Sequence, residues 1–127
     1  MNKNKYLIDL SASPKTDFGR VEFEKQTSSQ KVFSAIWALE SEVNSVGFSN
    51  YLNGSDSDTA EFAPIALKEI GAFKCASIVE KALQVGPDGD LDELDGQFYA
   101  YPDNLTDLLF EFVASHPETF GTIGSTD

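Results

Sequence analysis

Apolar residues recur every three or four positions along most of the chain, which is the spacing of one face of an α-helix. The first such run begins at Ser29 and ends at Gly47, a residue type that commonly stops helices. A short helical turn is expected directly after it, at 48–52. The apolar positions of the long run are Val32, Phe33, Ile36, Trp37, Leu39 and Val43.

Two further helices are predicted in the middle of the chain. Asp58 followed three residues later by Glu61 is typical of a helix N-cap with its capping-box partner, so we expect a helix from there to Gly71. Pro64 favours a later start or a kink, because proline is tolerated only in the first helical turn. The next helix is expected over 72–85. Its apolar face would hold Phe73, Ala76, Val79 and Leu83.

Two acidic helices are predicted in the last third of the chain, separated by Pro102. The first follows the spacing of Leu91, Leu94, Phe98 and Tyr101. The second has an apolar stripe from 105 to 113 and carries acids four residues apart on its opposite side. These acids are Asp103, Asp107 and Glu111.

The whole pattern predicts an all-α fold with one compact domain of about five to six helices over residues 29–120. Residues 1–28 lack a clear period, so we expect a loosely structured N-terminal arm. Residues 121–127 are small and polar, which favours a disordered tail. The core should include Phe33, Ile36, Trp37, Ile70, Val79, Leu83, Leu94, Phe98, Leu108, Leu109 and Phe112.

Charge changes this picture because it is distributed unevenly. The chain has a net charge of -12, and no Lys or Arg follows Lys81. A field of this sign repels nucleic acid and anionic membranes and attracts basic protein surfaces, so we expect a protein partner and no direct binding to nucleic acid or membrane. Of the ten acids after Lys81, those we expect to face the partner are Asp92, Glu93, Asp95, Asp103, Asp107 and Glu111.

Other candidate chemistry is weak in this sequence. Asp88, Asp90 and Asp92 alternate as in a calcium loop, but Glu93 stands where that loop needs glycine. His116 is the single histidine and Cys75 the single cysteine, so neither has a spaced partner for a metal site. We therefore expect no metal and no cofactor.

The same cysteine count bears on the compartment. A lone cysteine fits a reducing environment, and the apolar segment near the N-terminus is too short for a signal sequence. We expect a cytoplasmic protein. Paired carboxylates for acid–base catalysis stay open as a third interpretation, because an acidic chain offers many candidate pairs.

One block is more specific than composition. Glu42, Val43, Asn44, Gly47 and Phe48 form the pattern Glu-Val-Asn-x-x-Gly-Phe. With the segments Ala66 to Ala72 and Leu91 to Pro102, this block resembles the acidic, all-helical DNA-mimic protein family of bacteria, over about residues 30–120. The chain departs from the usual block at Ser45, Val46 and Asn50.

The resemblance implies a non-enzymatic protein whose acidic surface occupies a basic DNA-binding protein, such as a transcriptional regulator. The block also has a structural interpretation, as a helix end in which Gly47 takes a left-handed conformation and Asn44 ties down the turn. An alternative function is an interaction or immunity-type protein with a conventional interface, in which acidity serves solubility only.

The predicted charge density limits the DNA-mimic interpretation. B-DNA carries one charge per ~1.7 Å of axis, whereas residues 88–111 in helical form would supply roughly one carboxylate per 4.5 Å. Mimicry therefore needs acids from several elements to lie side by side, or a homodimer that doubles the acidic surface.

Overall fold

The computed structural model describes residues 2–54 and 57–122. Within these residues it contains eight α-helices, two short 3-10 turns and no strand, which confirms the all-α class and exceeds the expected helix count. The helices are α1 (Lys3–Ser11), α2 (Ser28–Val46), α3 (Phe48–Asn53), α4 (Ala63–Glu69), α5 (Phe73–Val85), α6 (Asp92–Tyr99), α7 (Leu105–Ala114) and α8 (Pro117–Phe120); the 3-10 turns are η1 (Phe23–Lys25) and η2 (Ser57–Thr59).

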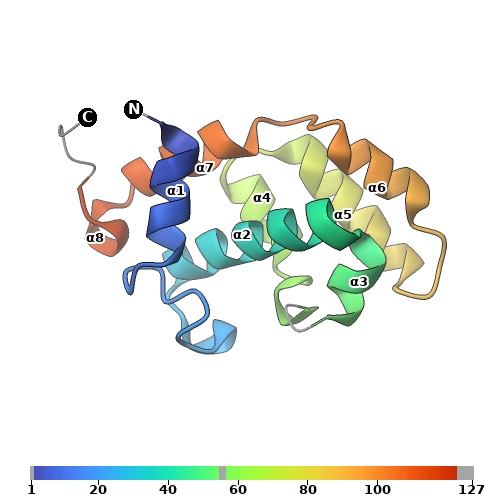
Figure 1. The fold of residues 1–127 in the computed structure, drawn as a ribbon, viewed down its shortest axis with the longest axis horizontal. Coiled ribbons are helices and arrows are strands. Elements are labelled where there is room, and N and C mark those ends of the chain that lie inside the picture. Colours follow the sequence, from blue (N-terminus) through green and yellow to red (C-terminus); the bar gives the residue numbers. More distant parts are fainter. Residues whose placement is uncertain (1, 55–56, 123–127) are drawn as a thin grey trace.

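Helix α2 is the central scaffold of the fold. It crosses the molecule, with α1, α7 and α8 towards one end and α3 and α6 towards the other (Figure 1). It begins at a capping box in which the side chain of Thr27 accepts from the Gln30 N–H and that of Gln30 accepts from the Thr27 N–H. The helix packs against α4 and α3, and α4 packs in turn against α5.

The core is built from the apolar faces that the sequence predicts. Trp37, Leu83 and Leu108 differ from the prediction in being only partly buried, although they pack against the core. The predicted core residues that are buried are Phe33, Ile36, Ile70, Val79, Leu94, Phe98, Leu109 and Phe112.

The N-terminal segment is ordered where we expected a loosely structured arm. Residues Lys3–Ser11 form α1, whose Leu7 and Leu10 are buried in the core. The ring of Tyr6 also meets the ring of Phe110 on α7 edge to face, with centroids 5.6 Å apart. The arm prediction is therefore wrong for α1, because three apolar residues at helical spacing suffice to dock it. Of the predicted tail, residues 123–127 lie outside the described residues.

The helix expected from Asp58 also differs. Asp58 lies in η2, and α4 begins at Ala63, so Pro64 falls in the first turn, where it needs no backbone donor. The Asp58–Glu61 capping box is therefore wrong.

Two aromatic residues depart from the predicted apolar stripes. Phe73 is the first residue of α5 and is 65% exposed, so the apolar face of this helix is buried only beyond its first turn. Tyr101 lies beyond the end of α6 at Tyr99 and has a positive φ of 55°. The helical period therefore no longer directs its side chain into the core.

Candidate functional site

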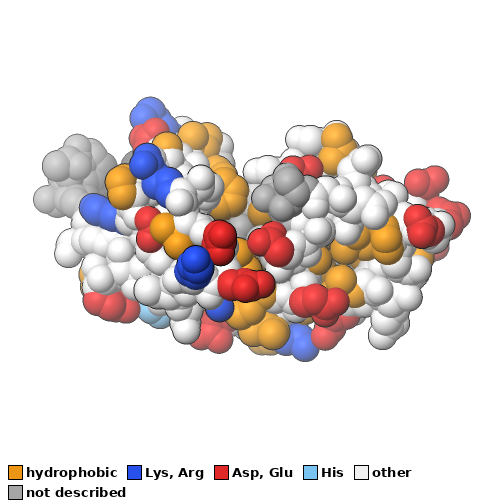
Figure 2. Space-filling model, turned by 90° about the horizontal axis from the view of Figure 1, so that it is seen from below, with side chains coloured by type: hydrophobic (Ala, Val, Ile, Leu, Met, Phe, Trp, Pro, Cys, Tyr) orange, Lys and Arg blue, Asp and Glu red, His pale blue; other side chains and the backbone are white. Residues whose placement is uncertain are grey.

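An exposed acidic patch surrounds the N-terminus of α6. We define the α6 patch as Asp88, Asp90, Asp92 and Glu93, all of which are exposed. Asp90 accepts a hydrogen bond from the Asp92 N–H at 3.1 Å, and the helix dipole favours the negative charge here. Among the described residues, no cation forms an ion pair with any of the four. Acidic side chains gather at the corresponding end of the molecule (Figure 2).

Two of the acids predicted to face a partner instead accept hydrogen bonds from backbone N–H groups within the fold. Asp95 Oδ1 accepts the N–H of Phe48 at 2.8 Å, at the start of α3. Asp103 Oδ2 accepts the N–H of Cys75 at 2.8 Å, in the first turn of α5. Both carboxylates are partly buried and satisfy backbone donors that a helix start leaves without partners. We therefore remove Asp95 and Asp103 from the candidate binding surface.

The remaining two predicted acids lie on α7. Asp107 is paired with Lys3 across the α1–α7 contact, at 3.3 Å, and also accepts from the Asn104 side chain. Glu111 is exposed and forms no ion pair with the described residues. Asp103 precedes α7, which begins at Leu105. The expected row of three acids along one helix face is therefore not formed.

The Glu-Val-Asn-x-x-Gly-Phe block forms the joint between α2 and α3. Gly47 separates the two helices with φ 88° and ψ 172°, an extended conformation that is essentially restricted to glycine. Tyr99 of α6 donates its hydroxyl to the Val43 carbonyl at 3.0 Å. Glu42 is half-buried and Asn44 is exposed, and neither side chain hydrogen-bonds to a described residue. The structural interpretation is thus right for the positive φ of Gly47 and wrong for Asn44.

Sequence reasoning missed the residues that hold this joint. Asp95 and Tyr99 on α6 form hydrogen bonds with this joint. A third hydrogen bond runs from the Asn50 side chain to the Val46 carbonyl at 3.0 Å. From the sequence alone, one could see only that Asp95 and Tyr99 are four residues apart and therefore lie on the same face of a helix. Which element that face meets depends on the tertiary fold.

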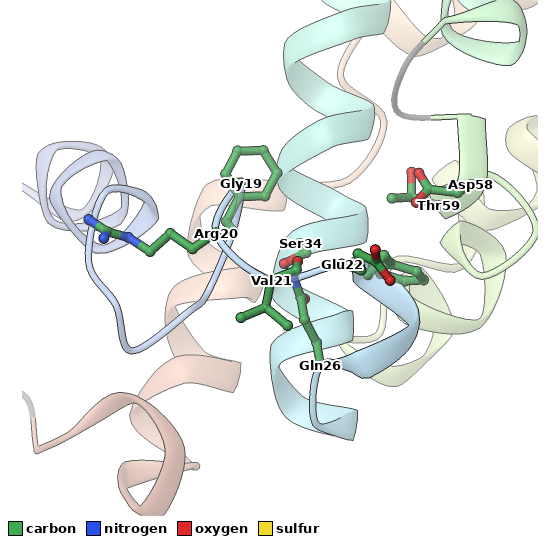
Figure 3. A pocket seen from close by; sticks show the side chains of 10 residues that line it. Gly19, Arg20, Val21, Glu22, Gln26, Ser34, Asp58 and Thr59 are labelled. Carbon is green, nitrogen blue, oxygen red and sulfur yellow. Dashed lines mark hydrogen bonds between the residues drawn. The ribbon is translucent and has the colours of Figure 1, made fainter.

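The pocket drawn in Figure 3 lies between the segment before η1, α2 and η2, with a volume of about 340 Å³. Ser34 donates to the Gln26 side chain at 2.7 Å, and that side chain donates to the Asp17 and Val21 carbonyls. Arg20 extends away from Asp58 and Thr59 (Figure 3). The Ser34 and Gln26 side chains in the pocket lining are therefore held by contacts within the fold.

The two lone reactive residue types are held in structural contacts. Burial raises the pKa of the Cys75 thiol to about 12, and the charge of Asp103 adds to the shift. His116 has its Nδ1 2.7 Å from the Phe112 carbonyl oxygen, and its ring stacks on that of Phe112 with centroids 4.1 Å apart. A neutral buried thiol is a poor nucleophile, so Cys75 is not arranged for covalent chemistry.

Neither a metal-ion site nor a membrane-spanning helix is found in the described part of the chain. Residues 2–54 and 57–122 contain no group of three or more His, Cys, Asp or Glu side chains placed to hold a metal ion. None of the helices in these ranges has both the length and the apolarity needed to cross a bilayer.

Comparison with known proteins gives one result. No curated protein and no solved structure matches the chain. The family model described as DMP19-like protein matches residues 24–116, which include the α2–α3 joint, α6 and the α6 patch. This match spans well over half of the sequence, and therefore the chain belongs to the DMP19-like protein family.

Proposed function

We propose that this protein is a non-enzymatic acidic module that binds a basic protein surface and acts as a DNA mimic, occupying a DNA-binding protein such as a transcriptional regulator. The observation that carries the proposal is the α6 patch, four exposed carboxylates without a cationic partner among the described residues. Membership of the DMP19-like family, a family of DNA mimics, supports the same role.

The local density of charge is consistent with mimicry at this site. The patch places its four carboxylates within residues 88–93. Most of this segment lies before α6 and is not helical; fully extended it would span about 20 Å, which gives roughly one charge per 5 Å. B-DNA offers one per ~1.7 Å, so the patch comes within a factor of about three. A basic groove that binds phosphates would meet a comparable field over a short stretch.

The test begins with the partner. Proteins retained from a cell extract by the immobilised chain at low salt are identified, and the retained basic protein is titrated with the purified chain. Duplex DNA should compete for the same surface, and raising the salt concentration should weaken the complex, because charge recognition is screened. A partner whose binding is indifferent to DNA would contradict mimicry.

A matched pair of variants locates the surface. The patch variant carries Asp88→Asn, Asp90→Asn, Asp92→Asn and Glu93→Gln. The control variant removes the same charge from exposed acids elsewhere: Glu24→Gln, Glu61→Gln, Glu69→Gln and Glu118→Gln. We expect the patch variant to bind at least about tenfold more weakly than the control. Equal loss in both variants would indicate that only net charge matters.

A second candidate function rests on exposed apolar side chains. Phe73, Tyr99 and Val46 are among the large hydrophobic residues that the structure leaves open to solvent. A conventional interface built on them would make the acidity a matter of solubility. Its binding would persist at high salt, so the salt titration separates it from the first proposal.

A further inference from the structure

A second candidate binding site lies away from the α6 patch, where α1, α2 and the start of α7 meet. A pocket of about 250 Å³ opens there. Leu7 and Ile8 of α1 and Trp37 of α2 supply apolar walls. Glu40, Ser41 and Thr106 add a carboxylate and two hydroxyl groups to the lining. The pocket is therefore amphipathic and carries a single acidic side chain.

Glu40 has no partner among the residues that the structure describes. Its carboxylate forms neither a hydrogen bond nor an ion pair with any of them. The lysines of α1 are engaged elsewhere, Lys3 with Asp107 at 3.3 Å and Lys5 with Asp9 at 2.9 Å. Burial raises the pKa of Glu40 to about 7, because the charged form is poorly solvated in this position. The pocket thus holds a carboxyl group, ionised above about pH 7, for which the described residues supply no counter-charge.

Two other carboxylates, one on α7 and one just before it, already have partners within the fold. The carboxylate of Asp103 lies before α7 and is bound to the Cys75 N–H. Glu40 and Asp103 both raise the pKa of the Cys75 thiol, so both act on the same region of the interior. Asp107 on α7 is offset by Lys3. The lysines of α1 are thus already paired, and Glu40 is the carboxylate in the pocket lining that an entering cation would meet.

We propose that the Glu40 pocket receives an arginine side chain of the partner. The inference rests on the proposed function, which supplies a basic partner protein. Arginine fits the lining better than lysine does, because its planar guanidinium offers five donors to the Glu40 carboxylate and to the Ser41 hydroxyl oxygen. The aliphatic stem can lie against Leu7 and Ile8, and the Trp37 ring offers a cation–π contact.

Arginine binding in this pocket should depend on pH. A bound guanidinium pairs with the ionised form of Glu40, so binding favours loss of the proton. Lowering the pH through about 7 protonates Glu40 and should weaken binding. Besides Glu40, the charged side chains on the elements that form the pocket are Lys3, Lys5 and Asp9 on α1, Lys31 and Glu42 on α2, and Asp107 and Glu111 on α7, with Asp103 just before α7. The decline near neutral pH is assigned to Glu40, because burial raises its pKa to about 7.

Trp37 makes the test direct, since it is the single tryptophan of the chain and lies in the pocket wall. The purified protein is titrated with N-acetyl-arginine methylamide while tryptophan emission is recorded. The neutral isostere N-acetyl-citrulline methylamide serves as the ligand control, with ionic strength matched. We expect a saturable change with the arginine derivative, with a Kd of about 1 mM for so small a ligand, and none with the citrulline derivative.

Two variants on α2 complete the experiment. E40Q should weaken the arginine response at least about tenfold. E42Q removes a half-buried carboxylate of the same helix that does not line the pocket, and it should leave the response unchanged. An equal response to citrulline, a response retained by E40Q, or no saturable response would overturn the proposal. No partner protein is needed, so this result stands apart from the DNA competition that tests the proposed function.

Discussion

The carboxylate of Asp95 accepts a hydrogen bond from the backbone N–H of Phe48, 2.8 Å away and 47 residues earlier in the chain. Phe48 is the first residue of α3 and Asp95 lies in the first turn of α6, so this bond joins two helices at the α2–α3 joint. The carboxylate also approaches Gly47 so closely that a Cβ there would lie 2.8 Å from Asp95 Oδ2. The family block and the acidic helix therefore form one structural unit.

Replacing Asp95 with alanine should destabilise the fold by about 1 to 2 kcal/mol, because the Phe48 N–H would lose its charged acceptor at a helix start. Asp95→Asn keeps an acceptor oxygen and should lose less. Urea unfolding followed by circular dichroism measures both. The control is Glu93→Ala, an exposed acid of the same turn, which should change stability by about 0.5 kcal/mol or less. Equal effects of Asp95→Ala and Glu93→Ala would show that the bond is not stabilising.

Gly47→Ala should destabilise the protein by about 2 kcal/mol or more, since alanine resists the positive φ and its Cβ would displace Asp95. Gly96→Ala is the matched control, because Gly96 lies within α6 and a Cβ there meets nothing within 4 Å. That change should instead stabilise by about 0.5 to 1 kcal/mol. Thermal melts of both variants test the contrast, and a loss of stability from Gly96→Ala would refute this account of the two sites.

Helix positions could be predicted from the sequence where apolar spacing is long and regular. The run from Val32 to Val43 predicts α2, and the stripe that ends at Val113 predicts α7. Both patterns persist over several turns, so the period is unambiguous. Helix α1 was missed because its pattern is short, with only Leu7 and Leu10 buried.

The roles of individual acids could not be predicted in the same way. Asp95, Asp103 and Asp107 look alike in sequence, yet their contacts lie 47, 28 and 104 residues away, at Phe48, Cys75 and Lys3. Such contacts depend on how helices pack, which local spacing does not encode. The excess of acidic residues after Lys81 is visible in the sequence. The sequence does not show which of these carboxylates remain accessible to a partner.

Cys75 should resist thiol reagents in the native protein. Its side chain is 1% exposed, and burial raises its pKa to about 12, so almost no thiolate is present near neutral pH. Reaction with a chromogenic disulfide reagent should be slow in buffer and complete in denaturant. Asp103→Ala removes the carboxylate that accepts the Cys75 N–H, and it should speed the native reaction by loosening the start of α5. Rapid labelling of the unaltered native protein would contradict the burial of this thiol.

Glu40→Gln should stabilise the protein above neutral pH and have little effect in acid. Burial raises the pKa of Glu40 from its ordinary 4.5 to about 7, so the folded state holds this proton more tightly than the unfolded state does. Stability from this group is therefore fully present below about pH 4.5 and is lost as the pH rises through about 7. Glutamine is neutral throughout, so the variant should exceed the natural protein by about 3 kcal/mol at alkaline pH.

Urea unfolding at pH 5 and at pH 8 measures this difference, with Glu42→Gln as the control on the same helix. The gain from Glu40→Gln should be small at pH 5 and large at pH 8, because only the ionised carboxylate is penalised by its surroundings. Glu42→Gln should give no comparable rise between the two conditions. A gain from Glu40→Gln that is the same at both pH values would show that the buried charge of Glu40 does not limit stability.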